Sequence, residues 1–190
     1  MGAGLKTYLA LGDSMSIDDY TGVTGGGAAT QFSRSLGSDY SLNDFTFDGC
    51  TIPQVPVHHH GDIITITIGG NDALQRIDEL LGSGVSRLAS DHLRLLCEIR
   101  ENNPESCIIV GNIYESQERL PDNFLKALYE LNDRIRANVA NINGRLADIH
   151  SAFQGNEGGF LCQNIEPTFE GAEAIACLFS KECQSWSQPI

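Results

Sequence analysis

A serine in a tight turn after a predicted strand is the first residue of the chain that could carry out chemistry. Ser14 lies in the run Gly-Asp-Ser at residues 12–14, directly after the mostly apolar segment 6–11. A serine in such a turn can act as a nucleophile, with nearby backbone N–H groups that stabilise an oxyanion. Taken alone, the turn has a simpler explanation, because serine and aspartate are common turn and cap residues.

A second polar group follows a different predicted strand. Residues 69–72 read Gly-Gly-Asn-Asp and come directly after the β-branched segment 62–68. The amide of Asn71 can donate to a developing oxyanion, and the glycines let the backbone approach a substrate. Ligands of parallel sheets bind at the carboxyl ends of the strands, so Ser14 and Asn71 are expected to lie at one edge.

The elements that must position these residues alternate between strand and helix along the chain. This alternation predicts a parallel sheet that is covered on both faces by helices. We expect residues 1–190 to form a single domain, because the chain is too short for two ordinary domains. The predicted strands are 6–11, 45–47, 62–68, 107–110 and 146–149, and the main predicted helices are 28–36, 86–101, 124–142 and 169–179.

Three short segments, each at the end of a predicted strand, resemble the conserved blocks of the SGNH (GDSL-type) serine hydrolases. Residues 12–14 match the first block, residues 48–51 (Asp-Gly-Cys-Thr) the second, and residues 69–72 the third. The three blocks occur in the family's order, and the resemblance extends over nearly the whole chain.

The resemblance implies a fold and a set of roles. The fold would be a flavodoxin-like three-layer α/β/α sandwich, with a five-stranded parallel sheet in the order 2-1-3-4-5. Ser14 would be the nucleophile, Gly49 and Asn71 would contribute to the oxyanion hole, and Asp13 would support them from behind. The implied activity is hydrolysis of esters, thioesters or acetyl groups.

The fourth block departs from the family pattern. The family has Asp-x-x-His-Pro, whereas residues 163–167 read Gln-Asn-Ile-Glu-Pro. Pro167 and Gly171, with the Ile-Ala pair at 175–176, fix the register. Glu166 therefore stands at the histidine position and Gln163 at the aspartate position.

This exchange changes the expected base. Histidine has an ordinary pKa of about 6.5 and glutamate one of about 4.3, so an unperturbed glutamate is the weaker base by about two units. Burial of Glu166 would raise its pKa and improve it as a base at mildly acidic pH. A glutamate base would not need the orienting partner that Gln163 has replaced.

Other side chains compete for a chemical role. His150 follows the predicted strand 146–149 at the correct edge of the sheet and is an alternative base, or else a solvated loop residue. His92 falls on the apolar stripe of its helix and is expected in the core. Residues 58–60 are three histidines at the opposite edge, where a solvated loop is favoured over a metal site. Ser16 is interpreted as a helix cap.

Composition restricts the partners. The chain has 25 acidic and 12 basic residues and a formal net charge of −13, which disfavours nucleic acid and anionic membranes. No apolar run approaches the roughly 20 residues of a membrane span, and no signal peptide is visible at the start. The six cysteines form no CxxC pair, so we expect no structural zinc site. We also expect no other cofactor, and a reduced, cytoplasmic protein. Export would allow a disulfide within Cys162, Cys177 and Cys183.

Three hypotheses follow. The first is a serine hydrolase of the lipase/esterase class that acts on small acyl or acetyl esters, with Ser14 as nucleophile and Glu166, or His150, as base. The second is an inactive binding module that keeps the pocket and the oxyanion hole. The third, a flavodoxin-like nucleotide binder, is disfavoured because no glycine-rich phosphate loop follows the first strand. A Glu166 carboxyl group within reach of Ser14 would favour the first over the second.

Overall fold

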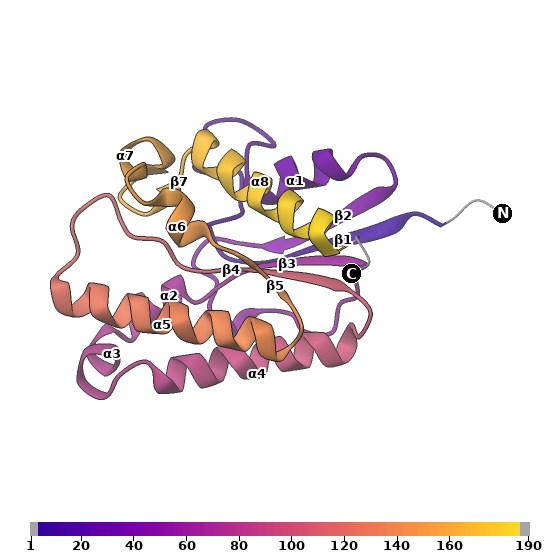
Figure 1. Ribbon diagram of the computed structural model, residues 1–190. Helices are drawn as coiled ribbons and strands as arrows, with labels where there is room; N and C mark the ends of the chain where they lie inside the picture. Colours follow the sequence, from indigo (N-terminus) through magenta and orange to yellow (C-terminus); the bar gives the residue numbers. More distant parts are fainter. Residues whose placement is uncertain (1–3, 187–190) are drawn as a thin grey trace.

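Five parallel strands form the central sheet of the computed structural model, which describes residues 4–186 (Figure 1). The strand order is β2-β1-β3-β4-β5, which confirms the order that the family resemblance implies. The strands are β1 (Lys6–Gly12), β2 (Tyr40–Thr46), β3 (Ile63–Thr67), β4 (Cys107–Gly111) and β5 (Arg145–Ala147).

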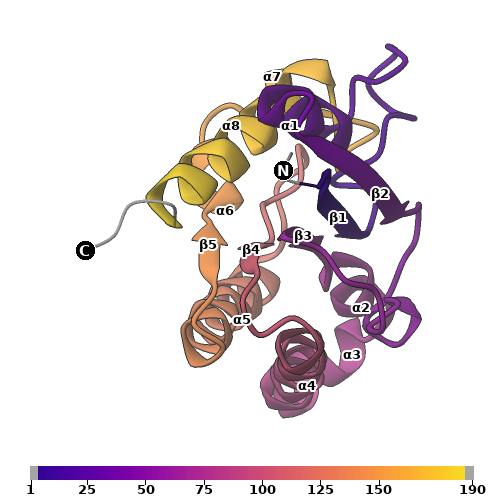
Figure 2. The ribbon, with the colours of Figure 1, turned by 90° about the vertical axis from the view of Figure 1, so that its right-hand side faces the viewer.

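Helices cover both faces of the sheet and make it the middle layer of three (Figures 1 and 2). One face carries α1 (Ala28–Leu36) and α8 (Phe169–Trp186), and the other carries α4 (Ser86–Asn102) and α5 (Asp122–Asn141). The predicted three-layer sandwich is therefore confirmed. Residues 4–186 also contain four short α-helices and one 3₁₀ helix: α2 (Gly70–Gln75), α3 (Ile77–Ser83), α6 (Ile149–Phe153), α7 (Glu157–Phe160) and η1 (Ile52–Gln54).

The side chains of the strands alternate between two separate cores. In β1, Leu9 and Leu11 pack in the core beneath α4 and α5, whereas Tyr8 and Ala10 pack in the core beneath α1 and α8. Every residue of β3 and β4 is buried. Burial on both faces explains why these two strands are nearly continuous apolar runs.

Two strands differ from their predicted bounds by more than one residue. β2 begins at Tyr40, well before the predicted segment 45–47. It is an edge strand whose residues are half-buried or exposed, so it lacks the apolar signal of the inner strands. β5 ends at Ala147, because the side chain of Asp148 accepts the backbone N–H of Ser151 (3.2 Å) and caps α6.

A small antiparallel hairpin lies outside the main sheet and was not predicted. It pairs β6 (Leu161–Cys162) with β7 (Glu166–Pro167). In the turn between them, Gln163 (φ 46°) and Asn164 (φ 76°) adopt the left-handed conformation without glycine. The turn therefore lacks the glycine signal that usually reveals a hairpin in a sequence.

Within residues 4–186, no helix is long and apolar enough to cross a bilayer. The same part of the chain has no disulfide and no group of three acidic, histidine or cysteine side chains that could hold a metal ion.

Candidate active site

The turn after β1 places Ser14 at the carboxyl edge of the sheet. Gly12 has φ +125°, and a Cβ there would collide with the backbone carbonyl of Thr67. The next backbone N–H, that of Asp13, donates to the Thr67 carbonyl oxygen (2.8 Å). Glycine thus permits β1 and β3 to approach closely at the point where the chain turns out towards Ser14.

Asp13 is a buried carboxyl group directly behind Ser14. One of its oxygens accepts the backbone N–H of Met15 (3.2 Å), and its side chain also hydrogen-bonds to Thr67. Burial raises the pKa of Asp13 to about 8, and the nearby Glu166 carboxylate adds to this increase. Near neutral pH, Asp13 is therefore largely in its neutral form.

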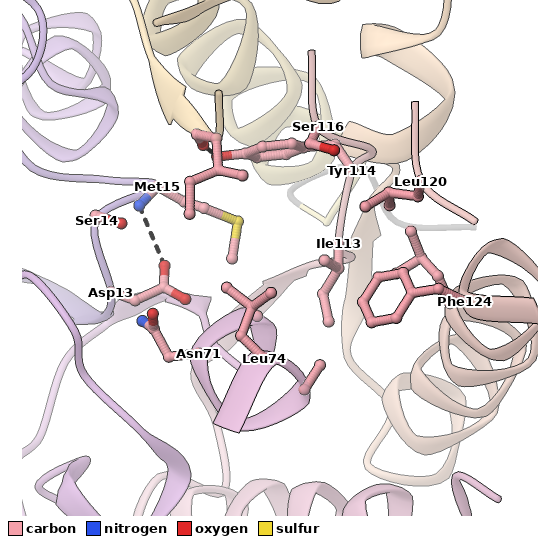
Figure 3. Close-up of a pocket in the computed structure, with 14 residues that line it drawn as sticks. Asp13, Ser14, Met15, Asn71, Leu74, Ile113, Tyr114, Ser116, Leu120 and Phe124 are labelled. Carbon is pink, nitrogen blue, oxygen red and sulfur yellow. Dashed lines mark hydrogen bonds between the residues drawn. The ribbon is translucent and has the colours of Figure 1, made fainter. Parts of the chain in front are cut away.

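The candidate oxyanion hole is tied to the N-terminus of α2. The Asn71 side-chain amide donates one hydrogen bond to the Cys50 carbonyl oxygen (3.0 Å). The carboxylate of Asp72 accepts the backbone N–H of Ile52 (3.1 and 3.2 Å). Together these bonds fix the segment that begins at Gly49, which adopts φ +73°. Figure 3 shows the Asn71 side chain beside Asp13, on the same side of the pocket as Ser14.

The Glu166 carboxyl group lies close enough to Ser14 for the serine side chain to affect its pKa. The Glu166 side chain is buried, with 8% exposed, and its Oε2 atom has no hydrogen-bond partner within residues 4–186. Burial raises the pKa of Glu166, the contact with Ser14 lowers it, and the negative charge of Asp48 raises it further, with burial the largest effect. The net pKa is above the ordinary value for glutamate, as a carboxyl group in a largely desolvated site requires.

The hairpin that carries Glu166 is held by the segment after β4. Tyr114 donates its hydroxyl hydrogen bond to the carbonyl oxygen of Ile165 (2.6 Å). The side chain of Gln117 donates to the Leu161 carbonyl (2.7 Å) and accepts the backbone N–H of Asn164 (3.1 Å). Bonds to β6, to the turn and to the residue just before Glu166 therefore fix the position of the glutamate.

Two other candidate residues, Gln163 and His150, do not lie next to Ser14 in the structure. Gln163 is exposed in the hairpin turn, and within residues 4–186 no hydrogen bond links it to Glu166. His150 is buried in α6, stacked on Tyr129, with Nε2 3.7 Å from Glu115 Oε1. It lines a cavity separate from the Ser14 pocket, because the start of α6 turns it towards α5.

Three further predictions have clear outcomes. Ser16 does not cap a helix: it is buried, and its hydroxyl pairs with that of Thr67 (2.9 Å). His92 is a core residue as predicted, 3.2 Å from the Asn138 side-chain amide, and burial lowers its pKa to about 4. His60 contacts the Asn102 carbonyl (3.0 Å) away from the Ser14 pocket.

An apolar pocket adjoins Ser14, and most of its residues were not singled out in the sequence. Ile113 and Tyr114 follow β4 at the same edge of the sheet as Ser14, which is the one signal that could have revealed them. Helix α5 contributes Phe124 and Leu128, which the sequence shows only as members of an apolar stripe. The pocket has a volume of about 80 Å³.

Solved structures with this fold include several ester hydrolases. A lipase from a goat rumen metagenome shares 21% identity, with a TM-score of 0.80 and coverage of 93% of this chain and 97% of that one. A lipolytic G-D-S-L family member from Veillonella parvula shares 17% (TM-score 0.73, coverage 92% and 96%). An acetylxylan esterase from Geobacillus stearothermophilus shares 15% (TM-score 0.74, coverage 94% of each). At these identities the likeness concerns the fold.

The sequence itself matches a family model over most of its length. A comparison with curated proteins finds no match. The model of the GDSL-like lipase/acylhydrolase family, in contrast, matches residues 10–174, which include the turn after β1, the start of α2 and the hairpin with Glu166. The chain belongs to the GDSL-like lipase/acylhydrolase family, whose members are carboxylic ester hydrolases.

Proposed function

We propose that the protein is a serine ester hydrolase in which Ser14 and Glu166 form a catalytic dyad, acting on small acyl esters. The observation that carries this proposal is the contact between the Ser14 hydroxyl and a buried carboxyl group whose pKa is raised. A raised pKa makes a carboxylate a better acceptor for the serine proton. The base occupies the family's histidine position, and it works without the aspartate that a histidine requires.

In this mechanism Ser14 Oγ attacks the ester carbonyl carbon while its proton passes to the Glu166 carboxylate. The backbone N–H groups of Ser14 and Gly49 and the free N–H of the Asn71 amide stabilise the oxyanion. When the tetrahedral intermediate collapses, the C–O bond to the alcohol breaks and Glu166 returns the proton to the leaving oxygen. Glu166 then takes a proton from water, whose oxygen attacks the acyl-serine. When this second intermediate collapses, the bond to Ser14 Oγ breaks, Glu166 returns the proton to that oxygen, and the acid is released.

Catalysis by this site is favoured when Asp13 is neutral and not ionised. A second negative charge behind Ser14 would oppose both the oxyanion and the ionised Glu166. Burial keeps Asp13 protonated near pH 7, since its pKa is raised to about 8. The site can then hold a single carboxylate at the pH of catalysis.

The first test is the pH dependence of p-nitrophenyl acetate hydrolysis from about pH 4 to 9. The base works in its ionised form, so the rate should rise with pH along a limb above the ordinary glutamate pKa of about 4.3. Ser14→Ala should reduce the rate to background. Glu166→Gln, which keeps the shape of the side chain, should lower kcat about 10²- to 10⁴-fold. Glu170→Gln, an exposed neighbour, should have no effect.

Glu166→His distinguishes the remaining outcomes. In an active parent, this variant should move the limb towards about pH 6.5, the ordinary histidine value. A parent without Ser14-dependent activity that gains it on Glu166→His would refute the dyad. That result would assign the natural protein to the inactive binding modules.

A further inference from the structure

The pocket beside Ser14 changes character along its length. Figure 3 shows Asp13, Ser14 and Asn71 at one side, Phe124 and Leu120 at the other, and apolar side chains between them. Away from the polar trio, Ser116 is the one aliphatic hydroxyl among the described residues that line it. The apolar lining consists of Met15, Ala73, Leu74, Ile113, Leu120, Phe124, Leu128 and Ile165, with the ring of Tyr114.

Among the described lining residues, none at the far side of the pocket is charged or offers an unpaired hydrogen-bond donor. The Tyr114 hydroxyl is already bonded to the Ile165 carbonyl (2.6 Å), so Tyr114 offers the pocket an aromatic face. Phe124 is 7% exposed and, together with Leu128, forms the part of the wall contributed by α5. A sugar or a charged group would lose its hydration here without replacement, whereas a hydrocarbon chain would not.

The position of the leaving alcohol indicates that the acyl group of the ester, and not the alcohol, enters this pocket. Glu166 must return a proton to the leaving oxygen, so the alcohol has to lie on the Glu166 side of Ser14. The Glu166 side chain does not line the apolar pocket. With the oxyanion directed to Gly49 and Asn71, the acyl substituent is the remaining group, and the pocket is the space next to it.

We propose that this pocket binds an unbranched acyl chain, and that Phe124 limits its length, so that the preferred substrates are esters of fatty acids longer than acetate. The inference rests on the proposed function in taking Ser14 as the reacting residue. Each methylene that enters the pocket should raise kcat/KM about fourfold, the factor expected for removing one methylene from water. The gain should end abruptly when the chain reaches Phe124.

The test is a series of p-nitrophenyl esters from acetate to decanoate. The parent should show a maximum of kcat/KM beyond acetate, and Phe124→Ala should move that maximum to longer chains. Tyr129→Ala removes an exposed aromatic residue of the same helix outside the pocket and should leave the maximum in place.

A second pair of variants changes exposed residues, so that the packing of the core is not disturbed. Leu74 (46% exposed) lines the pocket, whereas Leu81 (42% exposed) on α3 does not. Leu74→Asp places a charge beside the acyl chain and should reduce the increase in kcat/KM to less than twofold per methylene. Leu81→Asp introduces the same charge at a similarly exposed position outside the pocket, and it should keep the parent's increase in kcat/KM per methylene. A parent that prefers acetate, or equal effects of the two variants, would overturn the proposal.

Binding to a variant that cannot react separates this inference from the proposed function. Ser14→Ala can be titrated calorimetrically with ethyl acetate, butyrate, hexanoate and octanoate. Affinity that rises with acyl length, with no turnover in the parent, would support the pocket and refute the dyad. Ser14-dependent turnover with no chain-length effect in either measurement would support the dyad and refute the acyl pocket.

Discussion

Asp13 is a buried residue whose raised pKa makes the stability of the fold depend on pH. Its pKa is about 8 in the folded protein and about 3.9 in an unfolded chain. Between these values the folded state holds a proton that the unfolded state has released. The stabilisation is therefore complete below about pH 4 and is lost as the pH rises towards 8, by at most about 1.4 kcal/mol per unit.

Asp13→Asn should reduce this pH dependence. The amide oxygen can still accept the Met15 N–H, but the side chain cannot ionise. We expect the free energy of unfolding to fall less between pH 5 and pH 8 in Asp13→Asn than in the parent, as measured by urea denaturation. Asp19→Asn, at an exposed position of the same loop, should keep the parental dependence. An equal decrease in all three proteins would show that Asp13 is not protonated in the folded state.

The candidate site residues could largely be identified from the sequence, because the short motifs that contain them are defined by residue type and order alone. Ser14, Asn71 and Glu166 were identified in this way, and their roles remain predictions. The position of His150 was not readable, since it depends on where Asp148 ends β5 and starts α6. The cap at Asp148 starts α6, and the helix directs His150 towards α5 and not into the Ser14 pocket.

At the scale of elements, the β6–β7 hairpin is the part of the site most dependent on tertiary contacts. A two-residue strand pair is not stable by itself in water. Its support comes from Gln117, which bonds to Leu161 and Asn164. Neither the turn at 163–164 nor this support has a sequence signal, which is why the hairpin escaped prediction.

Gln117→Ala should loosen the hairpin and, through it, Glu166. We expect kcat to fall about tenfold, equivalent to about 1.4 kcal/mol of barrier, with little change in KM. Water that reaches Glu166 would lower its pKa, so the acidic limb of the pH profile should move to lower pH.

Glu118→Ala provides the matched control for the hairpin. Only the backbone N–H of Glu118 bonds to Asn164 (2.8 Å), and the substitution preserves it. The control should therefore keep both the parental kcat and the parental limb. A fall in kcat without movement of the limb in Gln117→Ala would mean that the hairpin does not determine the surroundings of Glu166.

The four main helices could be predicted from the spacing of their apolar residues, and the inner strands β3 and β4 from continuous apolar runs, because both faces of these strands are buried. Helix α1 was predicted with its observed bounds, since a glycine precedes it and another ends it. The edge strand β2 was predicted only at its end, because exposure removes the pattern on which such a prediction depends.

At the scale of the whole molecule, the net charge of −13 opposes folding. Charges of one sign are closer together in the folded protein than in the unfolded chain, and salt screens their repulsion. We expect the melting temperature to rise by about 2–4 °C between 10 and 200 mM NaCl, as a gain of about 1 kcal/mol would produce in a chain of this size.

A variant with less charge should respond less to salt. Glu101→Gln, Glu105→Gln and Asp133→Asn remove three exposed acidic groups and bring the net charge from −13 to −10. Thermal denaturation followed by circular dichroism should show a smaller salt increment in this triple variant. An equal increment in both proteins would attribute the effect to salt acting on apolar surface, and not to charge repulsion.

The separation of the β6–β7 hairpin from the main sheet has a consequence for how such an enzyme can diverge. Glu166 comes from the hairpin, whereas Ser14, Gly49 and Asn71 come from segments tied to β1, β3 and α2. The residue at position 166 can therefore be exchanged while those three segments keep their hydrogen bonds. On this scaffold the acidity range in which an enzyme works can evolve, or be redesigned, independently of the group that attacks the substrate.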